Sequence, residues 1–139
     1  MPEIEAAIGN VQLKKLPKFL ELRRRNAERL AAELQEVKSL QLPTVPDGCR
    51  HSWYLFTVRL KNGSKRQRDG IVDELRKLGI GATVYYPVPI HLMPFYRRYS
   101  KHLLPVTEKA AEQVFSLPIH PAVTSKQTDY IANSLCILL

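Results

Sequence analysis

Residues 82–96 read ATVYYPVPIHLMPFY and include two adjacent tyrosines and a histidine, side chains that can hydrogen-bond a ligand or exchange a proton with it. Tyr85 and Tyr86 end a short apolar run, and His91 follows the sequence Pro-Val-Pro. Each proline fixes φ at about −65° and removes a backbone donor, so this segment cannot continue a strand or enter a helix interior. The sequence therefore predicts a stiff, extended loop that leaves a strand end and presents Tyr85, Tyr86 and His91 in a fixed array.

Each of these side chains also has a purely structural interpretation. The chemistry of His91 alone favours a histidine that hydrogen-bonds the turn in which it sits. Tyr85 and Tyr86 are adjacent in an extended segment and point opposite ways, so one of them is expected in the core. Elsewhere, Trp53 is interpreted as a core residue, and the arginines at residues 23–25 as a solvated helix face.

Charge and composition narrow the range of partners. The net charge of +8 makes nucleic acid a partner to consider. The basic residues are scattered, however, and lack aromatic interleaving, so we expect no nucleic-acid partner. No apolar run is long enough to span a bilayer, and the first ten residues lack a signal-peptide layout, which predicts a cytoplasmic protein without a membrane partner. Cys49 and Cys136 are expected to be free thiols, and the histidine spacing predicts no metal site.

The elements that must position the loop follow from apolar periodicity. Residues 3–37 are expected to form a long helix with two apolar stripes, and Pro17 between the stripes predicts a kink or a break. The compact part is expected to contain strands at residues 52–60, 80–85 and 116–119, a short helical turn at residues 94–99, and three helices: residues 65–78 capped by Ser64 and ended by Gly79, a helix through Phe115 capped by Thr107, and residues 125–138 capped by Thr124. Residues 39–51 are interpreted as a connector.

This order predicts an α+β fold. We expect a small sheet of about three strands with helices on one face, preceded by the long N-terminal helix. The corresponding division is a helical segment at residues 1–37 and an α+β domain at residues 38–139. The first apolar stripe, from Ile4 to Val11, precedes the compact part and needs a surface to cover it. We expect that surface to be protein outside this chain or a second copy, which leaves open a non-catalytic module that docks or self-associates through the helix.

Four segments in register resemble the C-terminal part of the DegT/StrS family of sugar aminotransferases. They are MPEIEAAIGNVQLKKL, CRHSWYLFTVRL, RDGIVDELRKLGIGATVYYPVPIHLMPFY and AAEQVFSLPIHPAVTSKQTDYI, and together they span nearly the whole chain. The resemblance implies the small domain of a fold-type-I enzyme that depends on pyridoxal phosphate. It also implies a homodimer that transfers an amino group from glutamate or glutamine to a keto sugar, usually attached to a nucleotide.

The same resemblance assigns few roles within this chain. It implies that the catalytic lysine and the cofactor-binding groups belong to a large N-terminal domain and a neighbouring subunit, with the Asn- and Arg-containing phosphate segment falling just before Met1. We therefore expect no catalytic, cofactor-binding or metal residue here, and an inactive chain on its own. The loop resembles one that reaches the sugar, which makes Tyr86 and His91, with Tyr85, the candidate substrate contacts. The chain departs from the family at Tyr85 and Met93, where histidine and glutamine are frequent.

Overall fold

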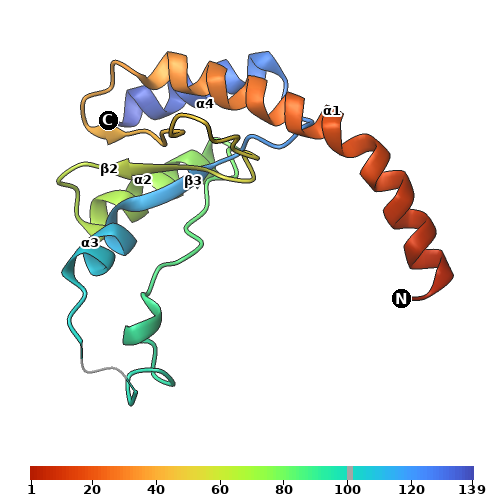
Figure 1. The fold of residues 1–139 in the computed structure, drawn as a ribbon. Helices are drawn as coiled ribbons and strands as arrows, with labels where there is room; N and C mark the ends of the chain where they lie inside the picture. Colours follow the sequence, from red (N-terminus) through yellow and green to blue (C-terminus); the bar gives the residue numbers. More distant parts are fainter. Residues whose placement is uncertain (100–101) are drawn as a thin grey trace.

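A sheet of three short antiparallel strands lies against a layer formed by two long helices (Figure 1). The structure is a computed structural model that describes residues 1–99 and 102–139. Along the chain the elements are α1 (Glu3–Leu34), β1 (Leu40–Gln41), β2 (Phe56–Leu60), α2 (Lys65–Lys77), the 3₁₀ helix η1 (Ile90–Leu92), α3 (Pro105–Gln113), β3 (Val114–Leu117) and α4 (Ser125–Leu138). The strand order is β1-β2-β3. The predicted α+β fold with a small sheet and a long N-terminal helix is confirmed.

One face of β2 faces the core. Phe56, Val58 and Leu60 are buried, whereas Thr57 and Arg59 on the opposite face are half-buried. Because side chains alternate along a strand, this pattern is that of a sheet covered mainly on one side. Helices α1, α2 and α4 all contribute to the hydrophobic cluster around Phe56; their fully or nearly fully buried members are Ala27, Leu30, Leu34, Val72, Leu75, Ile131, Ala132 and Leu135.

Helix α1 continues through Pro17 without a break, and Figure 1 shows it bending in its N-terminal half. The expected alternative of a second helix starting at Pro17 is therefore wrong, and α1 ends at Leu34, before residue 37. Around Pro17 the helix is exposed on all sides, so water can satisfy the carbonyl that proline leaves without its usual donor. The C-terminal half packs along α4, where Arg29 forms an ion pair with Asp129, and Asn26 Nδ2 donates to the carbonyl of Val123 in the loop before α4 at 3.1 Å.

The strands do not have the bounds that their sequence patterns predict. β2 begins at Phe56 rather than at residue 52, because Trp53 adopts a positive φ of 51° that turns the chain before pairing starts. Trp53 is nevertheless buried, as predicted. The two-residue strand β1 lies in the stretch interpreted as a connector, and β3 starts at Val114 rather than at residue 116.

Residues 80–85 do not form the expected strand. Only Thr83 pairs with the sheet, through a bridge to Ser116 in which each residue donates its backbone N–H to the other's carbonyl, at 3.0 and 2.8 Å. Pro87 follows four residues later and cannot donate to a ladder, which limits further pairing. The bridge still fixes the point from which the Pro-Val-Pro loop leaves the sheet.

Helix ends follow local chemistry where the cap is a short-range motif. Ser64 and Thr124 each form a capping box with a glutamine three residues later, and Gly79 has the left-handed φ of 77° expected of a helix terminator. Thr107, however, does not cap α3. That helix starts two residues earlier with Pro105 in its first turn, a position where the missing N–H has no helical partner to lose. In the described part of the chain, every helix is too short or too polar to cross a membrane.

This difference between the two threonines predicts a difference in stability. Replacing Thr124 with alanine is expected to lower the free energy of unfolding by about 1 kcal/mol, since the Gln127 N–H loses its side-chain acceptor. The Thr107→Ala variant is the matched control and should stay within about 0.5 kcal/mol of the unmodified chain. Urea denaturation followed by circular dichroism measures both. Equal losses in the two variants would contradict the assignment of the caps.

Candidate functional site

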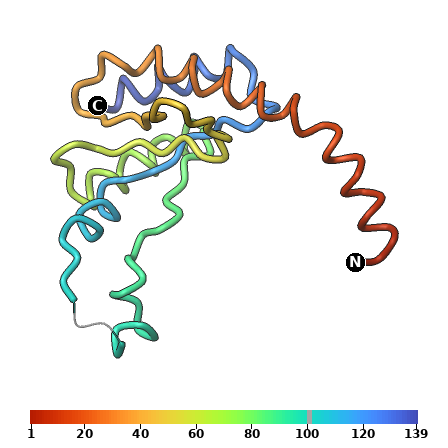
Figure 2. The backbone as a smooth tube through the Cα atoms, viewed as in Figure 1, coloured from red at the N-terminus to blue at the C-terminus, as the bar shows by residue number. Residues whose placement is uncertain are grey.

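The loop carrying the candidate site residues leaves the sheet after Thr83 and returns to the body at α3. Figure 2 shows this excursion reaching well away from the sheet, and we call residues 86–99 and 102–104 the arm. Its outward segment contains Pro87 and Pro89, and Pro89 immediately precedes η1. The arm then turns through backbone hydrogen bonds from Tyr96 and Arg97 to the carbonyl of Met93, so the expected turn at residues 94–99 is present.

Tyr85 lies at the base of the arm, on a hollow of about 260 Å³. Arg23, Tyr54 and His120 line the same hollow, from α1, the loop before β2 and the loop after β3. Both phenol rings are at least half exposed, with exposed fractions of 69% for Tyr54 and 50% for Tyr85. The hollow thus combines a cation, two phenols and an imidazole, a set suited to hydrogen-bonding a polar or anionic ligand.

Arg23 is a fixed part of this hollow. Its Nη1 donates to the carbonyls of Trp53 and Tyr54, at 3.1 and 3.0 Å, and its guanidinium carbon lies 5.9 Å from the centre of the Tyr54 ring. The interpretation of Arg23 as part of a freely solvated face is therefore wrong. Because the carbonyls belong to the turn with the positive φ at Trp53, Arg23 stabilises the backbone that holds Tyr54 at the hollow.

Tyr86 points away from the core with an exposed fraction of 71%. Since Tyr85 is also exposed, the expectation that one of the pair belongs to the core is wrong. Val84 takes the half-buried position instead and packs against the core cluster. Both phenols are consequently available to a ligand or to another protein surface.

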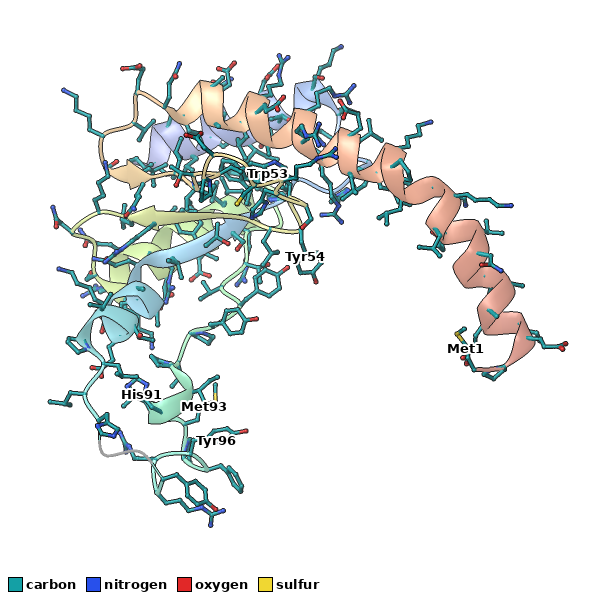
Figure 3. The ribbon with its side chains drawn as sticks, viewed as in Figure 1. Met1, Trp53, Tyr54, His91, Met93 and Tyr96 are labelled. Carbon is teal, nitrogen blue, oxygen red and sulfur yellow. The ribbon has the colours of Figure 1, made fainter. Side chains whose placement is uncertain are left out.

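His91 is held in a different place, on the arm itself (Figure 3). Its Nε2 lies 3.0 Å from Oε1 of Glu108 in the first turn of α3, and the same oxygen accepts the backbone N–H of Leu104 at 3.0 Å. Only 9% of the His91 side chain is exposed. One carboxylate thus joins the outward and the returning segments of the arm.

These hydrogen bonds hold the pKa of Glu108 below its ordinary value of 4.5. The bond with His91 is the largest cause, followed by the N–H of Leu104, while burial acts in the opposite direction. A carboxyl group with a lowered pKa in the folded chain stabilises the fold at pH values above its unfolded pKa, and loses that contribution as the pH falls through its folded pKa.

A pH dependence follows from this shift. The difference in unfolding free energy between the unmodified chain and Glu108→Gln should shrink as the pH falls below the ordinary pKa of the Glu108 carboxyl, because its stabilising contribution is lost as it is protonated. Urea denaturation at a series of pH values measures it. The exposed Glu112 provides the control, and a Glu112→Gln variant should show no such change in its difference from the unmodified chain. A difference for Glu108→Gln that is independent of pH would contradict the assigned hydrogen bonds.

Beyond His91 the arm ends in an exposed aromatic cluster. Arg98 stacks on Phe95 and Tyr99, with its guanidinium carbon 4.5 and 4.8 Å from the two ring centres. His91 also borders an apolar hollow of about 390 Å³ together with Ile90, Tyr96, Tyr99, Leu104 and Thr107. Within residues 1–99 and 102–139, Tyr85 and His91 therefore line two separate hollows.

Other parts of the surface offer less chemistry. The hollow of about 560 Å³ between α2 and the C-terminus contains none of the predicted site residues. Within residues 1–99 and 102–139, no group of three or more histidine, cysteine or acidic side chains is placed to hold a metal ion. Both cysteines are free and exposed.

Arg23, Tyr54 and Glu108 were not predicted as site residues. The Pro-Val-Pro motif located the arm, but no local pattern pairs Arg23 with carbonyls about 30 residues away, or Glu108 with a histidine 17 residues away. By itself, an acidic residue in the first turn of α3 indicates only a favourable interaction with the helix N-terminus.

Comparison with known proteins assigns this arrangement to a family. The model of the DegT/DnrJ/EryC1/StrS aminotransferase family matches residues 1–136. The dTDP-4-dehydro-2,3,6-trideoxy-D-glucose 4-aminotransferase of Saccharopolyspora spinosa is 35% identical over 132 residues, covering 94% of this chain and 33% of that protein. The dTDP-3-amino-3,4,6-trideoxy-alpha-D-glucose transaminase of Micromonospora megalomicea is 32% identical, covering 97% of this chain and 36% of that protein.

Solved structures give the same result. The aminotransferase TlmJ from Streptoalloteichus hindustanus superposes with a TM-score of 0.86 at 33% identity, over 96% of this chain and 35% of its own. DesV of S. venezuelae, in complex with a ketimine intermediate, superposes with a TM-score of 0.87 at 31% identity, over 97% of this chain and 36% of its own. This chain thus spans about a third of the length of the proteins it matches. The resemblance predicted from the sequence is confirmed: the chain belongs to the DegT/DnrJ/EryC1/StrS aminotransferase family and corresponds to the small domain of its members.

Proposed function

We propose that this chain is the C-terminal small domain of a nucleotide-sugar aminotransferase that depends on pyridoxal phosphate. In this proposal it supplies substrate contacts, while the catalytic lysine and the cofactor-binding groups belong to the remainder of the enzyme and to its neighbouring subunit. The observation that carries the proposal is the family match over residues 1–136 by a chain that spans only about a third of its relatives. We further propose that the complete enzyme is a homodimer located in the cytoplasm.

The lysines of the chain do not fit the cofactor. Pyridoxal phosphate, when bound, carries the amino group between donor and acceptor, and it requires a lysine whose ammonium is desolvated or lies in an electropositive setting. Every lysine in residues 1–99 and 102–139 is exposed to solvent. No step of the reaction is therefore assigned to a lysine of this chain.

In the proposed enzyme, residues 1–37 and residues 38–139 have different roles. The larger segment carries the sheet and the arm, and the N-terminal segment connects it to the rest of the enzyme. Ile4 and Ile8 are 76% and 58% exposed, although isoleucine is among the residues most often buried in folded proteins. In the proposed enzyme the large domain covers them.

The substrate contacts proposed are Tyr86 and His91, with Tyr85 at the base of the arm. Phenol and imidazole groups can each donate or accept a hydrogen bond without bringing a full charge, which suits the hydroxyl groups of a sugar. The prolines around them restrict the backbone, so little conformational entropy is lost when a ligand is bound. The role of these side chains is to orient the sugar.

A chimeric enzyme tests the proposal. This chain replaces the matching third of the S. spinosa aminotransferase, and the two half-reactions are followed separately by the absorbance of the cofactor. We expect a chimera that retains the cofactor and aminates a dTDP-linked keto sugar. Tyr86→Phe and His91→Gln should each slow the sugar half-reaction by about tenfold, as expected for one lost hydrogen bond, and leave the glutamate half-reaction unchanged.

The cofactor band provides the internal control for folding. A chimera that binds the cofactor and reacts with glutamate but never with the sugar would contradict the proposal. So would variants that slow both half-reactions equally, because Tyr86 and His91 would then act on something other than the sugar. Phe95→Ala is the matched control, because it alters the exposed aromatic cluster of the arm and leaves the proposed substrate contacts intact.

The exposed stripe on α1 supports a second candidate, a non-catalytic module that docks or self-associates. Val11, the last residue of the stripe, is 50% exposed. Sedimentation equilibrium of the chain, with and without residues 1–16, separates the candidates. A dimer that becomes a monomer on truncation would favour the module, and monomers in both cases would count against it.

A further inference from the structure

We propose that Glu108 is a positioning residue for His91: it fixes the imidazole through Nε2 and leaves Nδ1 as the atom that accepts a hydrogen bond from the sugar. The consequence for catalysis rests on the proposed function, whereas the fixed imidazole can be tested without it. Nothing in the sequence of the arm itself indicates this role, because the carboxylate comes from α3.

Glu108 joins three segments of the chain, and we call its hydrogen bonds with His91 and Leu104 the clasp. Oε1 of Glu108 accepts from the ring of His91 at the end of the Pro-Val-Pro segment and from the backbone of Leu104, where the arm returns, each at 3.0 Å. Glu108 itself is in the first turn of α3, whose helical hydrogen bonds fix its backbone. The ring of His91 is therefore held from the body of the domain, and not only by the arm.

The carboxylate also decides which ring nitrogen carries the proton. An ionised carboxylate can only accept hydrogen bonds, so Nε2 of His91 must donate. The lowered pKa of Glu108 keeps that carboxylate ionised at neutral pH. In the neutral ring Nδ1 is then an acceptor, and it has no hydrogen-bond partner among residues 1–99 and 102–139.

The position of the ring agrees with this role. His91 borders the apolar hollow of about 390 Å³ on the arm, so an acceptor at Nδ1 is placed beside apolar surface rather than among competing polar groups. A hydrogen bond formed in such a setting is stronger than one formed in bulk water. Removing the clasp would leave the ring free to rotate and would lengthen the average distance between Nδ1 and its ligand.

Nuclear magnetic resonance of the chain carrying ¹⁵N-labelled histidine tests the inference. In the unmodified chain we expect a downfield proton on Nε2 of His91 that exchanges slowly with water, assigned by its absence in His91→Gln. In Glu108→Gln the charge-assisted bond is lost, and the exchange of this proton should be at least about tenfold faster. The matched control is Glu112→Gln, which removes an exposed charge one turn further along α3 and should leave the signal unchanged.

A proton on Nδ1 in the unmodified chain would overturn the inference. So would an Nε2 signal that Glu108→Gln leaves unaltered. Trypsin cleavage after Arg97 or Arg98 separates positioning from simple anchoring of the arm: faster cleavage in Glu108→Gln with an unchanged imidazole signal would mean that Glu108 only anchors, which also overturns it. Backbone amide spectra verify that each variant is folded.

The chimeric enzyme gives the functional readout. Glu108→Gln should slow the sugar half-reaction by about tenfold, and the double variant with His91→Gln should be no slower than His91→Gln alone, because both act through one hydrogen bond. Additive losses would overturn the positioning role. A fixed imidazole in the chain together with an inactive chimera would contradict the proposed function but leave the clasp standing.

Discussion

Replacing Arg68 with alanine is expected to lower the free energy of unfolding by about 3 kcal/mol, since each buried acceptor left without a donor costs about 1–3 kcal/mol. Arg68 is completely buried, and its Nη1 donates to the carbonyls of Ala111 and Val114, at 3.0 and 2.7 Å. Its Nε donates to the carboxylate of Asp69. From its place on α2, this side chain therefore supplies the hydrogen-bond donor for carbonyl groups at the end of α3 and the start of β3.

Loss of Arg68 should also make the arm more mobile, because Arg68 holds α3 and α3 carries Glu108, which binds the arm. We expect urea denaturation to show the destabilisation, and trypsin to cleave faster after Arg97 or Arg98 in Arg68→Ala than in the unmodified chain. The neighbouring exposed Arg66 provides the matched control, and Arg66→Ala should change the unfolding free energy by no more than about 0.5 kcal/mol. Equal stabilities of the two variants would show that Arg68 does not hold α3.

Replacing Phe56 with alanine is expected to cost about 3–5 kcal/mol, the range measured for large aromatic residues removed from a packed core. Phe56 is completely buried at the start of β2, is paired in register with Leu117, and its ring centre lies 5.8 Å from that of Trp53. The cavity left behind would lie in the core cluster to which α1, α2, α4 and the sheet all contribute.

Phe95 provides a comparison of the same residue type. It is 60% exposed on the arm, so Phe95→Ala should leave the unfolding free energy nearly unchanged. Urea denaturation monitored by the fluorescence of Trp53 compares the two variants directly. A cost for Phe95→Ala as large as that for Phe56→Ala would mean that the arm packs against this chain far more than the structure shows.

The sequence predicted the features that depend on short-range chemistry. Ser64 and Thr124 each have a glutamine three residues later, and Gly79 follows an amphipathic pattern, so these helix ends could be recognised from a few neighbouring residues. The family resemblance added the domain as a whole. It rests on four segments in order, none of which is specific alone.

Features set by distant contacts were not predicted. The positive φ of Trp53 is stabilised by Arg23 from α1, so the start of β2 could not be read from its own alternating pattern. Residues 80–85 have the composition of a strand, but only Thr83 finds a partner. The separation of Tyr85 from His91, and the clasp of His91 by Glu108, likewise depend on where the body places α3.

The most direct test of the account is whether this chain binds pyridoxal phosphate by itself. The chain is titrated with the cofactor, reduced with borohydride and digested, and the labelled lysines are quantified by mass spectrometry. The account predicts sparse labelling spread over the exposed lysines, with no saturable absorbance band. Stoichiometric labelling of one lysine, with a band that disappears when that lysine is replaced by arginine, would place the cofactor site within this chain and contradict the account.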